Sequence, residues 1–322
     1  MRNNGETYSP DILGDGFQQM RLPLKDDYEG RVIATLVRRK PEHLSNKAIL
    51  YIHRFNDYFF QTELAKKFND NGYNFYALDL RKYGRSFLSH QKLNNVRSLE
   101  EYDEELNLSL QLLKSEQNAQ VILMGHSTGG LIVTNYAGKN LNSNFFHGVI
   151  CNSPFYEFNL NAFERKIGIP LLSALSTYFP NKKISAGLSK LYGYSLHKDN
   201  YGEWDYSLAW KPHAIKDVNI SFIDAIHKGH QNIQNNLKID VPLLVMYSSQ
   251  SVFDKKWSDK FMEADAVLNV KHLQHYANKI IGNVTTCEIE NGMHDLILSK
   301  KPVRAQVYKT MFEWIDKNFA LQ

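Results

Sequence analysis

The chain has 322 residues, of which 43% are hydrophobic, and a formal net charge of +4 with neutral histidines. This composition supplies enough apolar side chains for a large core and excludes gross disorder. The charge is too small and too dispersed to indicate a nucleic-acid partner, and no apolar run approaches the ~20 residues of a membrane span. The amino-terminal residues lack the apolar stretch of a signal peptide, so we expect a cytoplasmic protein.

The first half of the chain alternates apolar runs with segments of helical periodicity. Two β-rich segments, 16–24 and 31–39, come first and are joined by a turn-like linker. Buried strands are then predicted at 48–53, 75–80, 121–124 and 148–151, and helices at 61–71, 99–113 and from 131 onward. Strands that are apolar throughout and alternate with helices predict an α/β protein whose mostly parallel sheet is covered on both faces.

The alternation stops after Pro154 and returns with strands at 241–247 and 284–289 and a helix at 303–319. We therefore predict one α/β core, residues 1–154 and 236–322, interrupted by a helical insertion at 155–235, in which no strand is evident. The apolar residues between Phe163 and Phe179 are expected to line an acyl tunnel, to touch a lipid surface, or to form the insertion's own core. Segments 202–205 and 210–212 are expected to form an ordered turn near the sheet.

The stretch Gly125-His-Ser-Thr-Gly129 matches the G-x-S-x-G motif and lies between an apolar run and a helical segment. A strand that turns sharply into a helix holds its central residue in a strained conformation, and a Cβ at either flanking glycine would collide with neighbouring backbone. This context predicts that Ser127 is a nucleophile and that the Thr128 amide stabilises an oxyanion. The alternative is a glycine-rich loop with an unreactive serine.

His294 follows the last predicted strand. Enzymes that carry the G-x-S-x-G motif between a strand and a helix have their general base at this place in the chain order. The His294 imidazole can take the serine proton and return it to the leaving group. Two further histidine pairs, 227/230 and 272/275, have i, i+3 spacing, but no cysteine or carboxylate cluster accompanies them. We expect them to be solvated helix residues, and neither a metal nor a cofactor is implied.

Residues 51–58, 77–86 and the Ser127 motif resemble the monoacylglycerol lipase and lysophospholipase branch of the α/β-hydrolases, a branch also grouped with serine aminopeptidase-like hydrolases. The resemblance implies an α/β-hydrolase fold in which helices flank a mostly parallel sheet and the insertion forms a helical lid. It places a second oxyanion donor at the amide of Phe55. Arg54 stands where the family usually has glycine, but the Phe55 amide does not depend on that side chain. His53 is expected to brace this loop.

The acid that orients His294 is not fixed by the pattern, because its usual position falls near Gln250. Asp254 and Asp265 are the two candidates. The resemblance and the apolar neighbours of Asp265 favour it as the acid, whereas Asp254 precedes two lysines and is expected to be solvated. The alternative for Asp265 is that it caps the following helix.

These residues predict a serine hydrolase that cleaves carboxylic esters, of monoacylglycerol, lysophospholipid or small acyl type, through an acyl-enzyme. Its partners would be a small ester or lipid substrate and, transiently, a lipid surface touched by the lid. A peptidase on the same machinery is the second hypothesis, and it would need a carboxylate such as Glu157, Glu164 or Glu203 to hold a free amine. The third is a non-catalytic binding protein with a degenerate site, which Arg54 and Gln250 favour.

Overall fold

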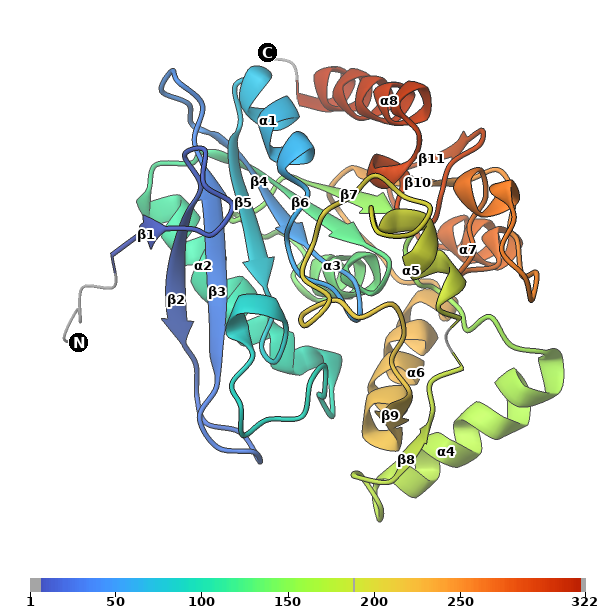
Figure 1. Cartoon of the computed structure of the whole chain (residues 1–322). Coiled ribbons are helices and arrows are strands. Elements are labelled where there is room, and N and C mark those ends of the chain that lie inside the picture. The colour runs from blue at the N-terminus through green and yellow to red at the C-terminus, as the bar shows by residue number, and fades with distance from the viewer. Residues whose placement is uncertain (1–6, 188, 320–322) are drawn as a thin grey trace.

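The computed structural model describes residues 7–187 and 189–319, and a nine-stranded sheet forms their centre (Figure 1). The strand order is β1-β2-β3-β5-β4-β6-β7-β10-β11, and all pairs from β5 to β11 are parallel. The sheet is therefore mostly parallel, as predicted, with an antiparallel edge at β1, β2 and β3. The strands are β1 (Ser9–Pro10), β2 (Gln18–Pro23), β3 (Ile33–Arg39), β4 (Lys47–Ile52), β5 (Asn74–Asp79), β6 (Gln120–His126), β7 (Gly148–Asn152), β10 (Leu243–Ser248) and β11 (Val284–Ile289).

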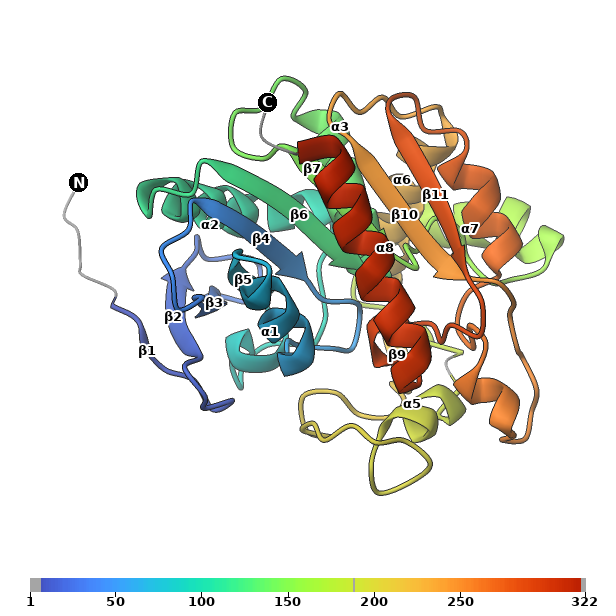
Figure 2. The same ribbon diagram turned by 90° about the horizontal axis from the view of Figure 1, so that it is seen from above.

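Helices cover both faces of the sheet, as the continuous apolar strands predicted (Figure 2). Ile49 and Tyr51 of β4 belong to the core beneath α1 (Thr62–Asp70) and α8 (Lys301–Phe319). Leu50 and Ile52 point to the other core, which α2 (Asp103–Ser115), α3 (Thr128–Lys139) and α7 (Val270–Ala277) cover. Because successive residues of a strand face opposite sides, an all-apolar strand can bury both of its faces.

The predicted helix at 99–113 is a 3₁₀ turn (Leu99–Tyr102) that continues into α2. Ser98 and Glu101 form a capping box at its start, so the turn begins where its free backbone N–H groups find side-chain acceptors. Further 3₁₀ turns are Gly84–Ser86, Asp259–Met262 and Leu296–Leu298.

The segment between β7 and β10 carries a π-helical turn (Glu164–Gly168), α4 (Ile169–Ser176), β8 (Lys183–Ser185), α5 (Leu191–Leu196), β9 (Asp217–Asn219) and α6 (Ile220–Gln234). We call this segment the insertion. Its strands β8 and β9 pair with each other in an antiparallel ribbon, which the sequence pattern did not predict because three residues are too few to show an alternation. Helix α6 lies beside α3, whereas α4 and the β8–β9 ribbon extend away from the sheet (Figure 1).

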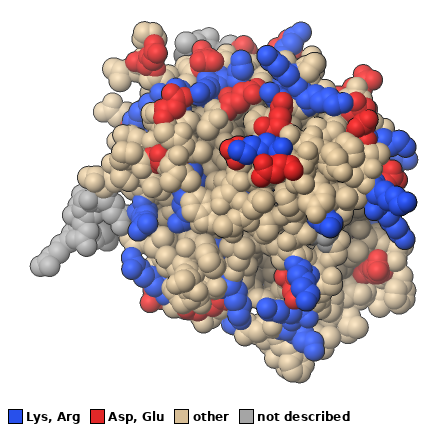
Figure 3. All heavy atoms as spheres, viewed as in Figure 1, with Lys and Arg blue, Asp and Glu red and all other residues tan. Residues whose placement is uncertain are grey.

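Lys and Arg are interspersed with Asp and Glu over the face of the molecule seen in Figure 1, and no broad area there carries one sign (Figure 3). Within residues 7–187 and 189–319, no helix has the length and apolarity needed to cross a membrane.

Candidate active site

Ser127 occupies a strained turn between β6 and α3, with φ 52° and ψ −112°. A non-glycine residue rarely adopts positive φ, and such outliers gather at functional sites. A Cβ on Gly125 would overlap the carbonyl of Gly129, and one on Gly129 would overlap the carbonyl of Ile52. The predicted steric need for both glycines is thus confirmed. Thr128 begins α3, so its N–H has no acceptor within the helix and is free to bind an anion.

His294 and Asp265 are joined by a hydrogen bond in the buried interior. His294 Nδ1 lies 2.8 Å from Asp265 Oδ2, and neither residue is exposed to solvent. A hydrogen bond from Nδ1 to a carboxylate fixes the tautomer in which Nε2 carries a lone pair. No described protein group forms a hydrogen bond with this Nε2. The ring is therefore oriented to accept a proton on Nε2.

Asp265 reaches His294 because its loop runs beside the end of β10. Its N–H donates to the Gln250 carbonyl at 2.9 Å, and its carbonyl accepts the N–H of Val252 at 2.9 Å. Its other carboxylate oxygen accepts the amides of Val267 and Leu268 at 2.8 and 2.7 Å. The residue is not the N-cap of α7, since Asn269 takes that place, and Asp254 is exposed.

The loop after β4 is braced by His53. Its Nδ1 donates to the Arg54 carbonyl at 2.7 Å, and its Nε2 accepts the Leu80 N–H at 3.0 Å. Burial lowers the pKa of His53, in keeping with a neutral ring that serves as both donor and acceptor. The Phe55 ring stacks on Phe222 with centroids 4.8 Å apart. We call residues 54–57 the oxyanion loop.

Asn152, which no sequence motif predicted, joins the nucleophile turn to the His294 loop. Its carbonyl accepts the Ser127 N–H at 2.9 Å and His126 Nδ1 at 3.0 Å. Its side-chain amide donates to Asp295 Oδ1 at 2.7 Å, and its side-chain oxygen accepts the Leu296 N–H at 3.2 Å. A polar residue ending the apolar run of β7 was the only signal in the sequence.

His294 is enclosed by rings and by the buried Asp295. The ring centroids of His126 and Tyr192 lie 4.8 and 5.5 Å from that of His294. The Tyr192 hydroxyl accepts the Asp295 N–H at 3.0 Å. Burial, with a smaller contribution from the nearby Asp57 charge, raises the pKa of Asp295 to about 6. These contacts fix the backbone on the carboxyl side of His294.

Comparison with known proteins identifies the family of the chain. A family model described as serine aminopeptidase, S33, matches residues 44–297. The chain belongs to this family. A monoglyceride lipase of Saccharomyces cerevisiae is 25% identical over an alignment of 287 residues that covers 84% of this chain and 84% of the relative.

Two solved structures show the same fold. A soluble variant of Saccharomyces cerevisiae monoglyceride lipase, in complex with a substrate analog, has a TM-score of 0.63 at 17% identity and covers 98% of this chain and 95% of its own. Paleococcus ferrophilus monoacylglycerol lipase has a TM-score of 0.64 at 17% identity, over 88% of this chain and 99% of its own. The predicted α/β-hydrolase fold is confirmed.

His230, which was predicted to be solvated, is buried in the structure of this S33 family member. It packs edge-on against Phe155 and Phe158 with centroids 4.7 Å away, and lies 2.8 Å from the Phe155 carbonyl through Nε2. The prediction that it is solvated was wrong, because α6 buries this side against the chain leaving β7. His275 is exposed. Among the residues that the structure describes, no group of three or more His, Cys, Asp or Glu is placed to hold a metal.

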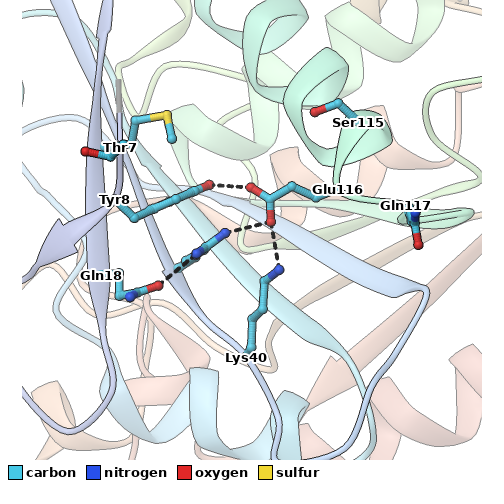
Figure 4. A pocket seen from close by; sticks show the side chains of 9 residues that line it. Thr7, Tyr8, Gln18, Lys40, Ser115, Glu116 and Gln117 are labelled. Atoms are coloured by element: carbon cyan, nitrogen blue, oxygen red, sulfur yellow. Dashed lines mark hydrogen bonds and ion pairs between the residues drawn. The ribbon is translucent and has the colours of Figure 1, made fainter. Parts of the chain in front are cut away.

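A surface hollow of about 620 Å³ lies between β2, β3 and the end of α2 (Figure 4). Glu116 accepts hydrogen bonds there from Tyr8 at 2.9 Å and Arg38 at 2.7 Å, and Lys40 lies 2.9 Å away. Since β3 runs antiparallel to β5, the carboxyl end of β3 lies at the amino ends of the parallel strands, whereas Ser127 lies at their carboxyl ends. The charges in this hollow are paired with one another, and it is not part of the candidate active site.

Proposed function

We propose that the protein hydrolyses carboxylic esters, of monoacylglycerol, lysophospholipid or small acyl type, through an acyl-enzyme. The observation that carries the proposal is the 2.8 Å hydrogen bond between His294 and Asp265. It leaves Nε2 of the His294 ring free to accept a proton. The strained turn that presents Ser127 supports it, as do the lipase relatives.

In this mechanism the Ser127 hydroxyl attacks the ester carbonyl while His294 Nε2 takes its proton. Asp265 stabilises the imidazolium that forms, and the amides of Phe55 and Thr128 donate to the oxyanion. His294 then protonates the departing alcohol, which leaves the acyl group on Ser127. A water molecule, deprotonated by His294, releases the acid and restores the serine. The mechanism requires neither a metal nor a cofactor.

The carboxylates of the insertion favour an ester over the free amine of a peptide. Glu157 Oε2 lies 3.3 Å from Arg165 Nη1 and 3.2 Å from the Tyr276 hydroxyl, so it is already occupied. Glu203 pairs with Arg304. Glu164 is exposed and accepts the Asn161 N–H in a local turn. An aminopeptidase would need an unpaired carboxylate at its substrate site. Glu157 and Glu203 are paired with arginines, and Glu164 stands exposed at the start of the π-helical turn.

We further propose that residues 155–235, which make up most of the insertion, act as a lid that touches lipid surfaces. Phe163, Ile167 and Leu171 are spaced four residues apart and are 69%, 53% and 58% exposed. Leu175, Tyr178 and Phe179 extend this exposed apolar row. Four-residue spacing puts side chains on one helix face, and an exposed apolar patch marks a contact surface. We call these six residues the apolar row.

The deciding experiment measures hydrolysis of p-nitrophenyl esters from acetate to laurate by the wild type and by Ser127→Ala. We expect turnover by the wild type and a loss of at least ~10³-fold in kcat for the variant, because the nucleophile is removed. Alanyl and leucyl p-nitroanilides test the peptidase alternative. Turnover of anilides alone would replace the ester proposal, and no reaction with any substrate or with a fluorophosphonate would favour a binding protein.

A further inference from the structure

A strap of the insertion, residues 203–213, packs across the oxyanion loop. Asn56 Nδ2 donates to the Pro212 carbonyl at 2.7 Å, and the Ser207 N–H donates to the Tyr58 hydroxyl at 2.8 Å. The rings of Tyr58 and Trp210 meet edge to face at 5.1 Å. We call this segment the strap.

The same strap is anchored to the chain that follows His294. Trp204 Nε1 donates to the Leu298 carbonyl at 2.9 Å, and Arg304 of α8 lies over the Trp204 ring at 5.0 Å. Arg304 also pairs with Glu203. The strap therefore bridges the two loops that carry the proposed oxyanion donor and the proposed base.

At the centre of the contact lies a buried cluster of charges. Lys211 Nζ is 2.7 Å from Asp57 Oδ2, and these side chains are 2% and 0% exposed. Arg54 Nε lies 3.5 Å from the same Asp57 oxygen, and Arg54 Nη1 donates to the Phe55 carbonyl at 3.1 Å. The other oxygen, Asp57 Oδ1, accepts the Tyr58 N–H at 2.9 Å. The carboxylate thus ties together both ends of the oxyanion loop and the strap.

A buried ion pair adds little net stability, but losing one partner is costly because the other is left uncompensated. Burial and, to a smaller extent, the nearby Arg54 charge, both opposed by Asp57, lower the pKa of Lys211 to about 8. Its ammonium form still predominates at pH 7. Without this cation, the 3.5 Å contact with Arg54 would be the remaining ion pair of the Asp57 carboxylate among the described residues, beside its hydrogen bond from the Tyr58 N–H, and Asp57 would draw the Arg54 side chain away from Phe55.

We propose that Lys211 is a positioning residue that acts through Asp57 and Arg54 to hold the oxyanion loop in its productive geometry. This inference rests on the proposed ester hydrolysis. The insertion would then contribute to the chemical step as well as to substrate access. Arg54, which the sequence left as a sign of a degenerate site, would then belong to this charged cluster.

The test compares Lys211→Met with Lys211→Met/Asp57→Asn, in which no carboxylate is left unpaired. For p-nitrophenyl butyrate we expect kcat to fall ~10- to 100-fold in Lys211→Met, with KM within about threefold of wild type, since a displaced oxyanion donor acts on the transition state. Affinity for a trifluoromethyl ketone should fall by the same factor as kcat/KM. The double variant should recover kcat to within about fivefold of wild type. Rates are divided by the amplitude of fluorophosphonate labelling, which counts competent sites.

Lys198→Met is the matched control, because Lys198 pairs with Asp205 on the exposed surface of the same insertion. It should keep wild-type kcat. If Lys211→Met does not fold, Tyr58→Phe breaks the Ser207 contact without exposing a charge and should lower kcat about fivefold at unchanged KM.

Wild-type kcat in Lys211→Met or, where that variant does not fold, in Tyr58→Phe would overturn the proposal. So would a folded double variant no faster than Lys211→Met. Either result, obtained with an inactive Ser127→Ala, would leave the ester hydrolase proposal standing.

Discussion

Replacing a single carboxylate is the sharpest test of Asp265 as the acid that orients His294. Asp265→Asn keeps the shape of the side chain but removes the charge that would stabilise the His294 imidazolium, and the amide can donate to Nδ1 and so favour the wrong tautomer. We expect kcat for p-nitrophenyl butyrate to fall by ~10² to 10⁴-fold. Labelling of Ser127 by a fluorophosphonate should slow in parallel.

Asp254 supplies the matched control, because its side chain is exposed. Asp254→Asn should stay within about twofold of wild type in kcat and KM. Equal, small losses in both variants would contradict Asp265 as the acid and would mean that His294 is oriented without it.

Candidate site residues could be predicted from the sequence where they stand in a short local motif. Ser127 and His294 stand in short motifs whose flanking strands set their geometry, so the chain order was informative. Asp265 was one of two open candidates, because its approach to His294 depends on the backbone pairing of Ser251 with Asp265. Asn152 and Lys211 act through contacts with residues far away in the chain, at Asp295 and Asp57. No motif marks such pairs.

At the scale of one element, α6 carries a buried histidine, His230, that should make the stability of the protein fall in acid. Burial lowers the pKa of His230 from its ordinary 6.5 to about 3. Between these values the unfolded chain binds a proton that the folded protein does not, so the free energy of unfolding falls as the pH falls. One proton corresponds to ~1.4 kcal/mol per pH unit. Between pH 6.5 and 4.5, His230 should therefore remove about 2–3 kcal/mol of stability.

Urea unfolding of His230→Gln at pH 6.5 and 4.5 measures this contribution. Gln retains a donor for the Phe155 carbonyl but takes up no proton, so the variant should lose about 2–3 kcal/mol less than wild type across this range. His275→Gln, at an exposed position of α7, is the control and should lose as much as wild type. If all three proteins lose the same free energy, the acid sensitivity does not come from His230.

The elements themselves were predicted well where strands are buried on both faces. Their apolar runs and the intervening helical periodicity follow directly from a parallel sheet between two helical layers. Prediction failed in the insertion, where β8 and β9 are too short to show a period and the π-helical turn has no sequence signature. Of the three alternatives left open for the apolar residues from Phe163 to Phe179, a core within the insertion does not hold for most of them, since six of these side chains are exposed.

At the scale of the whole molecule, the insertion joins two faces with different chemistry. Its inner face carries the strap, which contacts the loops on either side of the candidate active site. Its outer face carries the apolar row, with Lys182 and Lys183 following it in the chain. If the row enters a lipid surface, the strap would place the oxyanion loop and the His294 loop at a fixed distance from that surface.

The double variant Ile167→Ser/Leu171→Ser tests this arrangement. Each side chain is more than half exposed, so its transfer into lipid should contribute roughly 1 kcal/mol, and the two together about tenfold or more in affinity. We expect binding to phosphatidylcholine vesicles, and hydrolysis of monoacylglycerol carried in them, to fall by that factor. Hydrolysis of the monomeric ester p-nitrophenyl butyrate should stay within about twofold of wild type.

Leu44→Ser is the control for this experiment. Leu44 is fully exposed but precedes the amino end of β4, whereas Ser127 follows the carboxyl end of the parallel strand β6. It should leave vesicle binding unchanged. Unaltered vesicle binding by the double variant would refute a role for the apolar row at lipid surfaces. An equal loss on the monomeric ester would instead indicate that these side chains bind the acyl chain, because a surface contact has no effect on a substrate that is free in solution.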